Sequence, residues 1–252
     1  MNIDKSINSF ELTVLSLCDG MSCGQIALEQ AGFKIGRYFA AEIKDIAIKV
    51  TKDNYPNTIH IGDVNKIFYK NGVLHTEVGD FRTNIDVVMF GSPCQSFSRA
   101  MIKERKIGLE DPERSGLFYE CNRVLKEVNP KYFLMENVVM KKEDEKVNSE
   151  MIGVKPIRIN SSLVVGQLRD RYYWTNIPGV TVPEDRKITL QSVLNDGYTP
   201  DEKAKCLRRN DSHGFYNGCA WTPIKRFHRF YYKSFGTMVF PSKEYFENCL
   251  EV

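Results

Sequence analysis

The sequence has no long apolar run and no cysteine pattern of the kind that binds a metal. Its seven cysteines are irregularly spaced, without a Cys-x-x-Cys pair or a matched His-Cys signature. We therefore expect reduced thiols and no metal site. No stretch is long and apolar enough to span a bilayer, and the first residues lack an apolar core. We expect no membrane association and a cytoplasmic location.

An excess of charge of one sign is also missing. The 35 Lys and Arg residues against 32 Asp and Glu residues give a formal charge of only +3, so the whole chain shows no bias toward a polyanion. Basic residues do cluster locally, and the cluster at 225–233 is interleaved with aromatics. That pattern suits phosphate contact and base stacking, which makes Lys225, Arg226 and Arg229 candidate nucleic-acid contacts. A solvated surface explains the same pattern.

Internal repeats and low-complexity tracts are absent, and 252 residues that are 42% hydrophobic suffice for one main core. Apolar runs at 12–17, 38–42, 58–61, 85–90 and 132–136 predict strands, and helix-like segments lie between several of them, at 24–31, before 55 and around 116–128. Strands of this kind, joined by helices, predict a doubly wound, mostly parallel α/β sheet. Turn residues become frequent after Trp174, so we predict a main domain over 1–180 and a smaller, irregular region over 181–252.

Polar or glycine-containing segments follow three successive predicted strands. Gly20 lies in the turn after the first strand, where backbone can approach a ligand closely. Glu42 ends the second strand, where a carboxylate can accept both hydroxyl protons of a ribose. Asp63 follows the third, where it can accept from an amine such as that of adenine or cap a helix. Together these residues predict a nucleoside-bearing cofactor. The glycines do not have the Gly-x-Gly-x-x-Gly spacing of nicotinamide and flavin enzymes.

Cys94 lies just after the predicted fourth strand and is a candidate nucleophile. A lone cysteine there is more often a buried apolar residue, but partners follow it along the chain. Glu136 ends the predicted fifth strand, and Arg169 and Arg171 alternate at strand spacing, so they are predicted to project to one face. These residue types would suit the activation of a cytosine ring by a thiolate. Addition of the thiolate to carbon 6 puts negative charge into the ring, which an acid can relieve at N3 while arginines hold the O2 carbonyl and a phosphate. Structural ion pairs are the alternative explanation of these charged residues.

In their order and spacing, the motifs of residues 12–180 resemble the cytosine carbon-5 DNA methyltransferases. The resemblance rests on the glycine motif after the first strand, Glu42, Asp63, Pro-Cys-Gln at 93–95, Gly-Leu-Phe at 116–118, Glu-Asn-Val at 136–138 and Gln-x-Arg-x-Arg at 167–171. It implies a Rossmann-like methyltransferase fold that uses S-adenosylmethionine and releases S-adenosylhomocysteine. It also implies double-stranded DNA as the substrate, with the target cytosine flipped out of the helix.

The same resemblance implies roles for single residues. Cys94 would be the covalent nucleophile, Glu136 would engage N3 and the amino group, and Arg169 and Arg171 would steady the base and the active-site loop. Asn137 would help to position that loop against DNA. The S-adenosylmethionine pocket would be lined by Leu17, Asp19, Gly20, Met21, Glu42, Ile43, Asp63, Val64, Pro93 and Leu117. Residues 96–115 match the closing loop of the family, from which Ser96, Ser98 and Arg99 would contact DNA.

One element of the family is not found in the sequence: the Gly-Asn-type motif whose helix completes the cofactor pocket. Residues 181–252 are therefore predicted to form a partial target-recognition region, and a second polypeptide is expected to supply the missing motif. A naturally shortened enzyme and a degraded gene are alternatives. Two other functions stay open, namely methylation of cytosine in tRNA and a non-catalytic DNA-binding subunit of the same fold. The motifs disclose neither the target sequence nor a restriction-modification or phage role.

Overall fold

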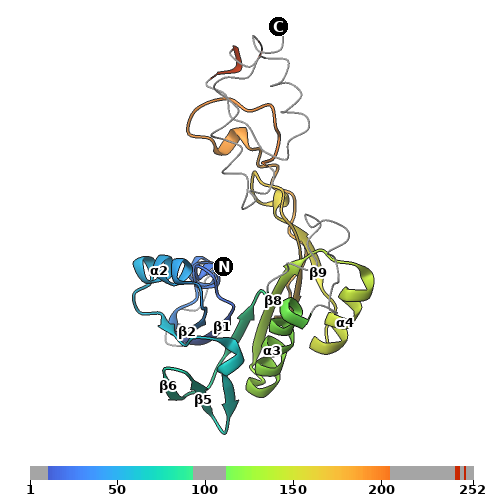
Figure 1. Ribbon diagram of the computed structural model, residues 1–252. Helices are drawn as coiled ribbons and strands as arrows, with labels where there is room; N and C mark the ends of the chain where they lie inside the picture. The colour runs from blue at the N-terminus through green and yellow to red at the C-terminus, as the bar shows by residue number, and fades with distance from the viewer. Residues whose placement is uncertain (1–10, 93–111, 205–241, 245–246, 248–252) are drawn as a thin grey trace, which may run out of the picture. The chain divides into compact units, whose positions relative to one another are not determined.

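The computed structural model of the chain describes residues 11–92, 112–204, 242–244 and 247 (Figure 1). These residues belong to two compact units. The first contains residues 1–157 and 172–180, and the second contains residues 158–171 and 181–252. The division into a main domain over 1–180 and a smaller region over 181–252 stays a prediction.

The central sheet has the strand order β3-β2-β1-β7-β8-β10-β9. Five of its strands pair in parallel: β3 (Ile59–His60), β2 (Ile35–Ala41), β1 (Leu12–Leu17), β7 (Val87–Phe90) and β8 (Tyr132–Val138). The other two, β9 (Ile157–Asn160) and β10 (Asp170–Thr175), have residues in both units. The chain moves outward from β1 to β2 and β3, then returns to β7 on the other side of β1. The crevice between β1 and β7 is therefore the point at which strand order reverses, where open α/β sheets bind ligands.

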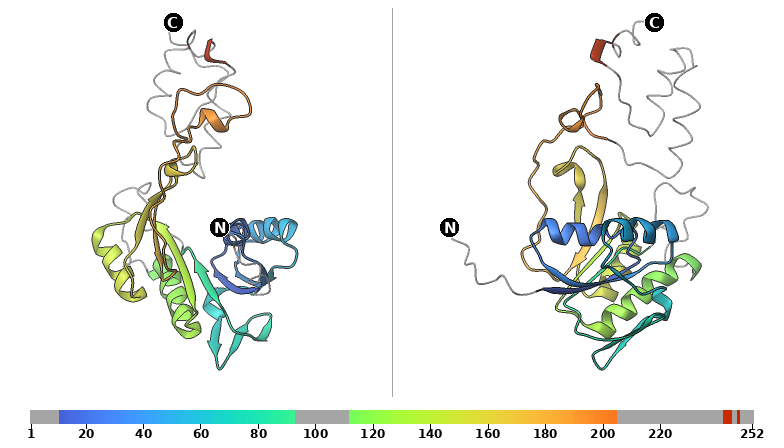
Figure 2. Two further views of the ribbon diagram at one scale, coloured as in Figure 1. Left: turned by 180° about the vertical axis from the view of Figure 1, so that it is seen from behind. Right: turned by 90° about the vertical axis from the view of Figure 1, so that its left-hand side faces the viewer.

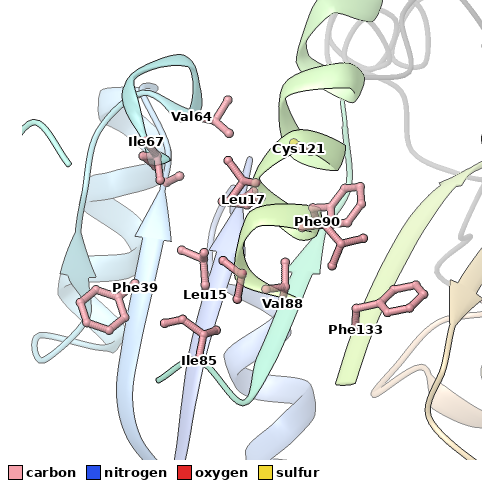
Figure 3. Close-up of a cluster of buried hydrophobic side chains, with 14 of the residues drawn as sticks. Leu15, Leu17, Phe39, Val64, Ile67, Ile85, Val88, Phe90, Cys121 and Phe133 are labelled. Atoms are coloured by element: carbon pink, nitrogen blue, oxygen red, sulfur yellow. The ribbon is translucent and has the colours of Figure 1, made fainter. Parts of the chain in front are cut away.

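Side chains alternate between the two faces of the sheet, and each face has its own core. Leu15 and Leu17 of β1 belong to the larger cluster, with Val88 and Phe90 of β7 and the buried side of α3 (Pro112–Val128), which carries Cys121 (Figure 3). Val14, Tyr38, Ala40 and Val87 belong to a second cluster, against which Leu28 of α1 packs. Burial of each such large side chain stabilises the fold by roughly 1.5–3 kcal/mol. The sheet is thus covered on both faces.

Two helices share the face opposite α3: α1 (Cys23–Gln30) and α2 (Asp45–Asn54) (Figure 2). They are joined through side chains, since the Tyr55 hydroxyl donates to Glu29 at 3.0 Å. Helix α1 lies close to the sheet because Gly24 has no side chain: a Cβ there would lie 3.1 Å from both the Met89 methyl carbon and the Tyr38 hydroxyl. Helix α4 (Lys142–Ile152) has three acidic residues in its first turn, where negative charge interacts favourably with the positive end of the helix dipole. It ends at Gly153, whose φ of +87° is typical of a glycine that terminates a helix.

A three-stranded antiparallel sheet, which the sequence analysis did not predict, precedes β7. It consists of β4 (Phe68–Lys70), β5 (Val73–Thr76) and β6 (Gly79–Arg82). Its first turn is Asn71-Gly72 with φ +53° and +75°, the backbone that an Asn-Gly hairpin turn requires. Arg123 of α3 donates to the Ile67 carbonyl at 2.8 Å, which ties this sheet to the helix.

The predicted α/β fold with a mostly parallel sheet is confirmed. The first strand spans the predicted residues 12–17, and the predicted strands at 38–42, 58–61, 85–90 and 132–136 correspond to β2, β3, β7 and β8 with shifted ends.

The described part of the second unit is organised around one ammonium group. Lys203 Nζ donates to the carbonyl oxygens of Ser162 at 2.7 Å and Val165 at 3.4 Å, and also to that of Ile188. These carbonyls belong to two separate stretches of the chain, so Lys203 holds them together. Two short 3-10 helices lie in this unit, at Ser161–Leu163 and Gln191–Val193.

Candidate active site

Strand register brings the residues that follow four parallel strands to one edge of the sheet. Leu17 pairs with Ala41 and with Phe90, and Phe90 pairs with Met135. The next residues along the chain are Cys18, Glu42, Gly91 and Glu136. Because the strands are parallel, these residues meet at the carboxyl edge, beside the crevice between β1 and β7.

A cavity of about 370 Å³ opens at this edge. Six of the ten residues predicted to line the cofactor pocket line this cavity: Gly20, Glu42, Ile43, Asp63, Val64 and Leu117. Five further residues line it that the sequence analysis did not select: Cys18, Ala41, Lys44, Gly62 and Gly91. The cavity wall thus combines apolar side chains, bare backbone at glycines and two carboxylates.

The Glu42 carboxylate is fixed by backbone amides on both of its oxygens. The N–H of Gly20 donates to Oε2 at 2.8 Å, and the N–H groups of Ile43 and Lys44 donate to Oε1, both at 2.9 Å. Hydrogen bonds to a charged acceptor are the stronger class. Glu42 therefore lies in the cavity wall in one orientation and also holds the first loop against the end of β2.

Asp63 caps a short helix with one carboxylate oxygen. Its Oδ1 accepts from the backbone N–H of Asn65 at 3.0 Å and from the Asn65 amide at 2.8 Å, at the start of the 3-10 helix Val64–Lys66. The other oxygen, Oδ2, has no hydrogen-bond partner among the described residues. Both functions considered for Asp63 are therefore compatible, because capping uses one oxygen and leaves the other.

The loop after β1 has an unusual backbone and a buried polar support. Cys18, Gly20 and Ser22 have φ values of +53°, +65° and +56°. Beneath them, Asp19 accepts from the Tyr38 hydroxyl at 2.8 Å and from the Ser22 hydroxyl. Burial raises the pKa of Tyr38, and the Asp19 charge raises it further. Asp19 therefore supports the loop from inside the protein.

Three residues predicted for the pocket, Leu17, Asp19 and Met21, are not among those that line the cavity. The side chain of Leu17 is fully buried in the core, because β1 turns it toward α3. Met21 is 52% exposed.

Glu136 lies beside Gly91, which lines the cavity. A Cβ built at Gly91 would lie 3.4 Å from Oε2 of Glu136, which is ordinary contact distance, so this carboxyl lies against the residue that follows β7. The neighbouring residues also meet: the buried Asn137 amide donates to the Ser92 hydroxyl at 3.2 Å and accepts from the Val138 N–H at 2.8 Å. The segment that leads to Cys94 is thus bonded to the Glu-Asn-Val motif.

Arg169 and Arg171 lie in the second unit: Arg169 directly precedes β10, and Arg171 is its second residue. Asp170 between them forms a two-oxygen ion pair with Arg158 of β9, with distances of 2.5–3.1 Å. Arg171 donates to the Asp170 carbonyl at 2.8 Å, and the Arg169 N–H donates to the Asn160 side chain at 3.2 Å.

The remaining predicted site residues lie outside the described residues: Pro93, Cys94, Ser96, Ser98, Arg99, Lys225, Arg226 and Arg229. Within the described ranges, no three His, Cys, Asp or Glu side chains form a group that would hold a metal ion. None of the helices in these ranges combines the length and apolar character needed to cross a membrane.

The sheet order and the cavity define an α/β protein with a cavity at the carboxyl edge of its sheet, the place where open α/β sheets bind ligands. Residues 12–152 match the family of C-5 cytosine-specific DNA methylases, and the chain belongs to this family.

Several curated relatives are Type II methyltransferases. M.NgoBV of Neisseria gonorrhoeae is 35% identical over 148 residues, which cover 57% of this chain and 32% of that protein. M.Eco47II of Escherichia coli is 35% identical over 136 residues, which cover 54% of this chain and 29% of that protein. The matched part of the chain thus spans about a third of the length of these relatives.

A solved structure has a similar fold. It is the crystal structure of an E. coli protein described as a DNA modification methyltransferase encoded within a prophage. It aligns with a TM-score of 0.50 and 24% identity, over 66% of this chain and 46% of that one. At this identity the likeness concerns the fold.

Proposed function

We propose that the chain is a DNA methyltransferase that transfers a methyl group from S-adenosylmethionine to carbon 5 of cytosine in double-stranded DNA. The observation that carries the proposal is the contact between the two halves of the site. Gly91 lines the cavity and at the same time lies against Glu136. A cofactor in the cavity and a base held by Glu136 would then be neighbours, as direct methyl transfer requires.

The cavity fits the proposed cofactor in size and chemistry. Its volume of about 370 Å³ lies in the range of small-molecule sites, roughly 300–1,000 Å³. Glu42 offers a fixed carboxylate to the ribose hydroxyls, and Oδ2 of Asp63 offers an acceptor to the adenine amine. Ile43, which is 65% exposed, offers an apolar surface for the adenine ring. When bound, S-adenosylmethionine supplies an electrophilic methyl group.

The residues of the chain would activate the base. The Cys94 thiolate adds to carbon 6 of cytosine, which moves electron density to carbon 5. Glu136 donates a hydrogen bond or a proton at N3, and Arg169 and Arg171 hold the O2 carbonyl and the active-site loop. After transfer, removal of the carbon-5 proton and loss of the thiolate restore the aromatic ring. The Asn137–Ser92 hydrogen bond supports this assignment, because it joins the segment before Cys94 to the residue after Glu136.

Covalent trapping tests the proposed reaction. With fluorine at carbon 5, the ring has no proton to lose after methyl transfer, so the enzyme stays bound to the base. We expect the chain with S-adenosylmethionine to form a complex with a 5-fluorocytosine duplex that survives denaturing electrophoresis, and Cys94→Ala to form none. Trapping on 5-fluorocytosine tRNA but not on the duplex would establish the RNA alternative. Tight, non-covalent DNA binding without trapping would favour a non-catalytic subunit.

Two parts of the proposal concern partners. Ser96, Ser98, Arg99 and the basic run with Lys225, Arg226 and Arg229 are proposed to contact the DNA backbone and bases. The expected second polypeptide stays a prediction, and addition of the product of a neighbouring gene to the trapping reaction tests it directly.

A further inference from the structure

Two thiols from different elements meet at the wall of the cavity. Cys18 follows β1, is partly exposed and lines the cavity, whereas Cys121 lies on α3 and is fully buried. Their sulfur atoms are 3.9 Å apart. Cys121 lies one helical turn after Leu117, which also lines the cavity, and Figure 3 shows it on the side of α3 that faces the sheet.

The two thiols have unequal surroundings, because Cys18 lines the cavity whereas Cys121 is buried in the core. The hydrogen bond with Cys121 lowers the pKa of the Cys18 thiol, against the opposing effects of burial and of the carboxylates of Glu42 and Asp63. The pKa of Cys121 is raised, first by its hydrogen bond to Cys18 and then by its own burial. Cys18 is thus the thiol that is open to the cavity, and Cys121 is the buried thiol behind it.

We propose that Cys18 is a peroxide-reactive modification site and that Cys121 is its resolving thiol. Reactive cysteines of this type combine thiolate character, access to solvent and a second thiol nearby. The geometry of the pair supplies access and the neighbour: the cavity admits a small hydroperoxide to Cys18, and the only other thiol that the described residues place within hydrogen-bonding distance is Cys121. The inference goes beyond the proposed function and does not depend on it.

The chemistry has two steps. The Cys18 thiolate attacks one oxygen of the hydroperoxide, so that an S–O bond forms, the O–O bond breaks and hydroxide or alkoxide leaves. Sulfur is oxidised to sulfenic acid, and the peroxide is reduced. The Cys121 sulfur then attacks the Cys18 sulfur: an S–S bond forms, the S–O bond breaks, and the leaving hydroxide takes the Cys121 proton to become water. The net reaction consumes two thiols and one peroxide.

The disulfide would join the loop after β1 to α3 in the wall of the cavity. The sulfur atoms must approach from 3.9 Å to bonding distance, which moves the loop that carries Gly20 toward the helix. If the cavity binds S-adenosylmethionine as proposed, oxidation lowers cofactor affinity. That consequence rests on the proposed function, whereas the modification itself does not.

Peptide mapping after peroxide treatment of the full chain tests the proposal. Trypsin releases residues 6–34, which contain Cys18 and Cys23, and residues 115–123, which contain Cys121 alone. Cys23 is an exposed free cysteine five positions from Cys18, so it serves as a matched control. Two variants are compared: Cys23→Ser leaves Cys18 as the only thiol of the first peptide, and Cys18→Ser leaves Cys23.

We expect the two peptides to become disulfide-linked in Cys23→Ser at least about tenfold faster than in Cys18→Ser. In Cys121→Ala, dimedone should label residues 6–34 at Cys18, because the sulfenic acid has lost its resolving partner. Equal linkage rates in the two serine variants would overturn the proposal. So would a Cys23→Ser protein in which the two peptides stay unlinked while other cysteines of the chain are oxidised.

Discussion

At the residue scale, the Glu42 carboxylate joins two parts of the site. It accepts from three backbone amides, one on the first loop and two after β2, and it faces the cavity. Its position at a strand end could be predicted from the sequence, because Glu42 follows an apolar run. The amide contacts could not, since they depend on how the loop at Gly20 folds back.

Glu42→Gln is predicted to weaken cofactor binding. Glutamine replaces one acceptor oxygen with an NH₂ donor and removes the negative charge, so the charge-assisted hydrogen bonds that Glu42 is proposed to accept from the ribose hydroxyls are lost. Their loss costs about 1.5–3 kcal/mol, so titration calorimetry should show the Kd for S-adenosylhomocysteine increased by about 10- to 100-fold. Asp53→Asn, on the exposed side of α2, makes the same charge change as a control. Equal affinities in the two variants would count against the assignment of the cavity.

Tyr38 predicts a pH dependence of stability. Because burial and the neighbouring Asp19 raise its pKa, the folded protein keeps the phenol proton where the unfolded chain, with a pKa of about 10, loses it. The retained proton makes a contribution to the free energy of unfolding that is fully present below pH about 10 and is lost as the pH rises further. Between pH 9 and 11, urea unfolding should show a loss about 1.4 kcal/mol larger in the wild type than in Tyr38→Phe. Parallel pH profiles would show that Tyr38 does not titrate differently in the two states.

At the element scale, the apolar strands of the central sheet were predictable, whereas the strands of the small antiparallel sheet were not. Burial of both faces gives β1 and β7 their mostly apolar sequences, which identify them without a structure. The strands β4, β5 and β6 each contain polar or charged residues and alternate weakly, so the sequence shows no apolar run there. Asn71-Gly72, a strong hairpin signal, was the one sequence feature that could have revealed them.

Several residues of the cavity wall could not be predicted from the sequence either. Gly62 and Gly91 contribute backbone rather than side chains, so no residue type signals their role. Cys18 lines the cavity while its neighbour Asp19 points inward, because the left-handed backbone at Cys18 breaks strand alternation. Lys44 directly follows Glu42 and Ile43, and its position in the wall follows from the turn that leads into α2.

Lys203→Met is predicted to loosen the second unit. Methionine keeps the apolar stem but cannot donate to the carbonyls of Ser162, Val165 and Ile188. Loss of these bonds should cost about 1–3 kcal/mol, because the carbonyls lose a charged donor. Hydrogen exchange at the amides of Arg186 and Leu190, which bond across this region, should be faster by about tenfold or more. Lys187→Met, on the exposed surface of the same unit, should leave exchange unchanged; equally slow exchange in both variants would contradict the structural role of Lys203.

At the scale of the whole molecule, the proposed DNA contacts come from the basic run at 225–233 as well as from the first unit. Replacing Lys225, Arg226 and Arg229 with alanine should lower affinity for any duplex and flatten its salt dependence. The slope of log K against log salt should fall by about 0.9 for each lost phosphate contact. Alanine at three lysines of the first unit, Lys49, Lys70 and Lys126, removes the same charge. An equal effect of both triple variants would indicate attraction by net charge alone.

The reaction itself can be measured on the nucleoside product. The chain is incubated with a cytosine-containing duplex and S-adenosylmethionine whose methyl group is deuterated, and the digested DNA is analysed by mass spectrometry. The proposed function predicts trideuterated 5-methyl-2′-deoxycytidine with the wild type and none with Cys94→Ala. Label on an exocyclic amine of cytosine or adenine, or label confined to tRNA in a parallel reaction, would contradict it.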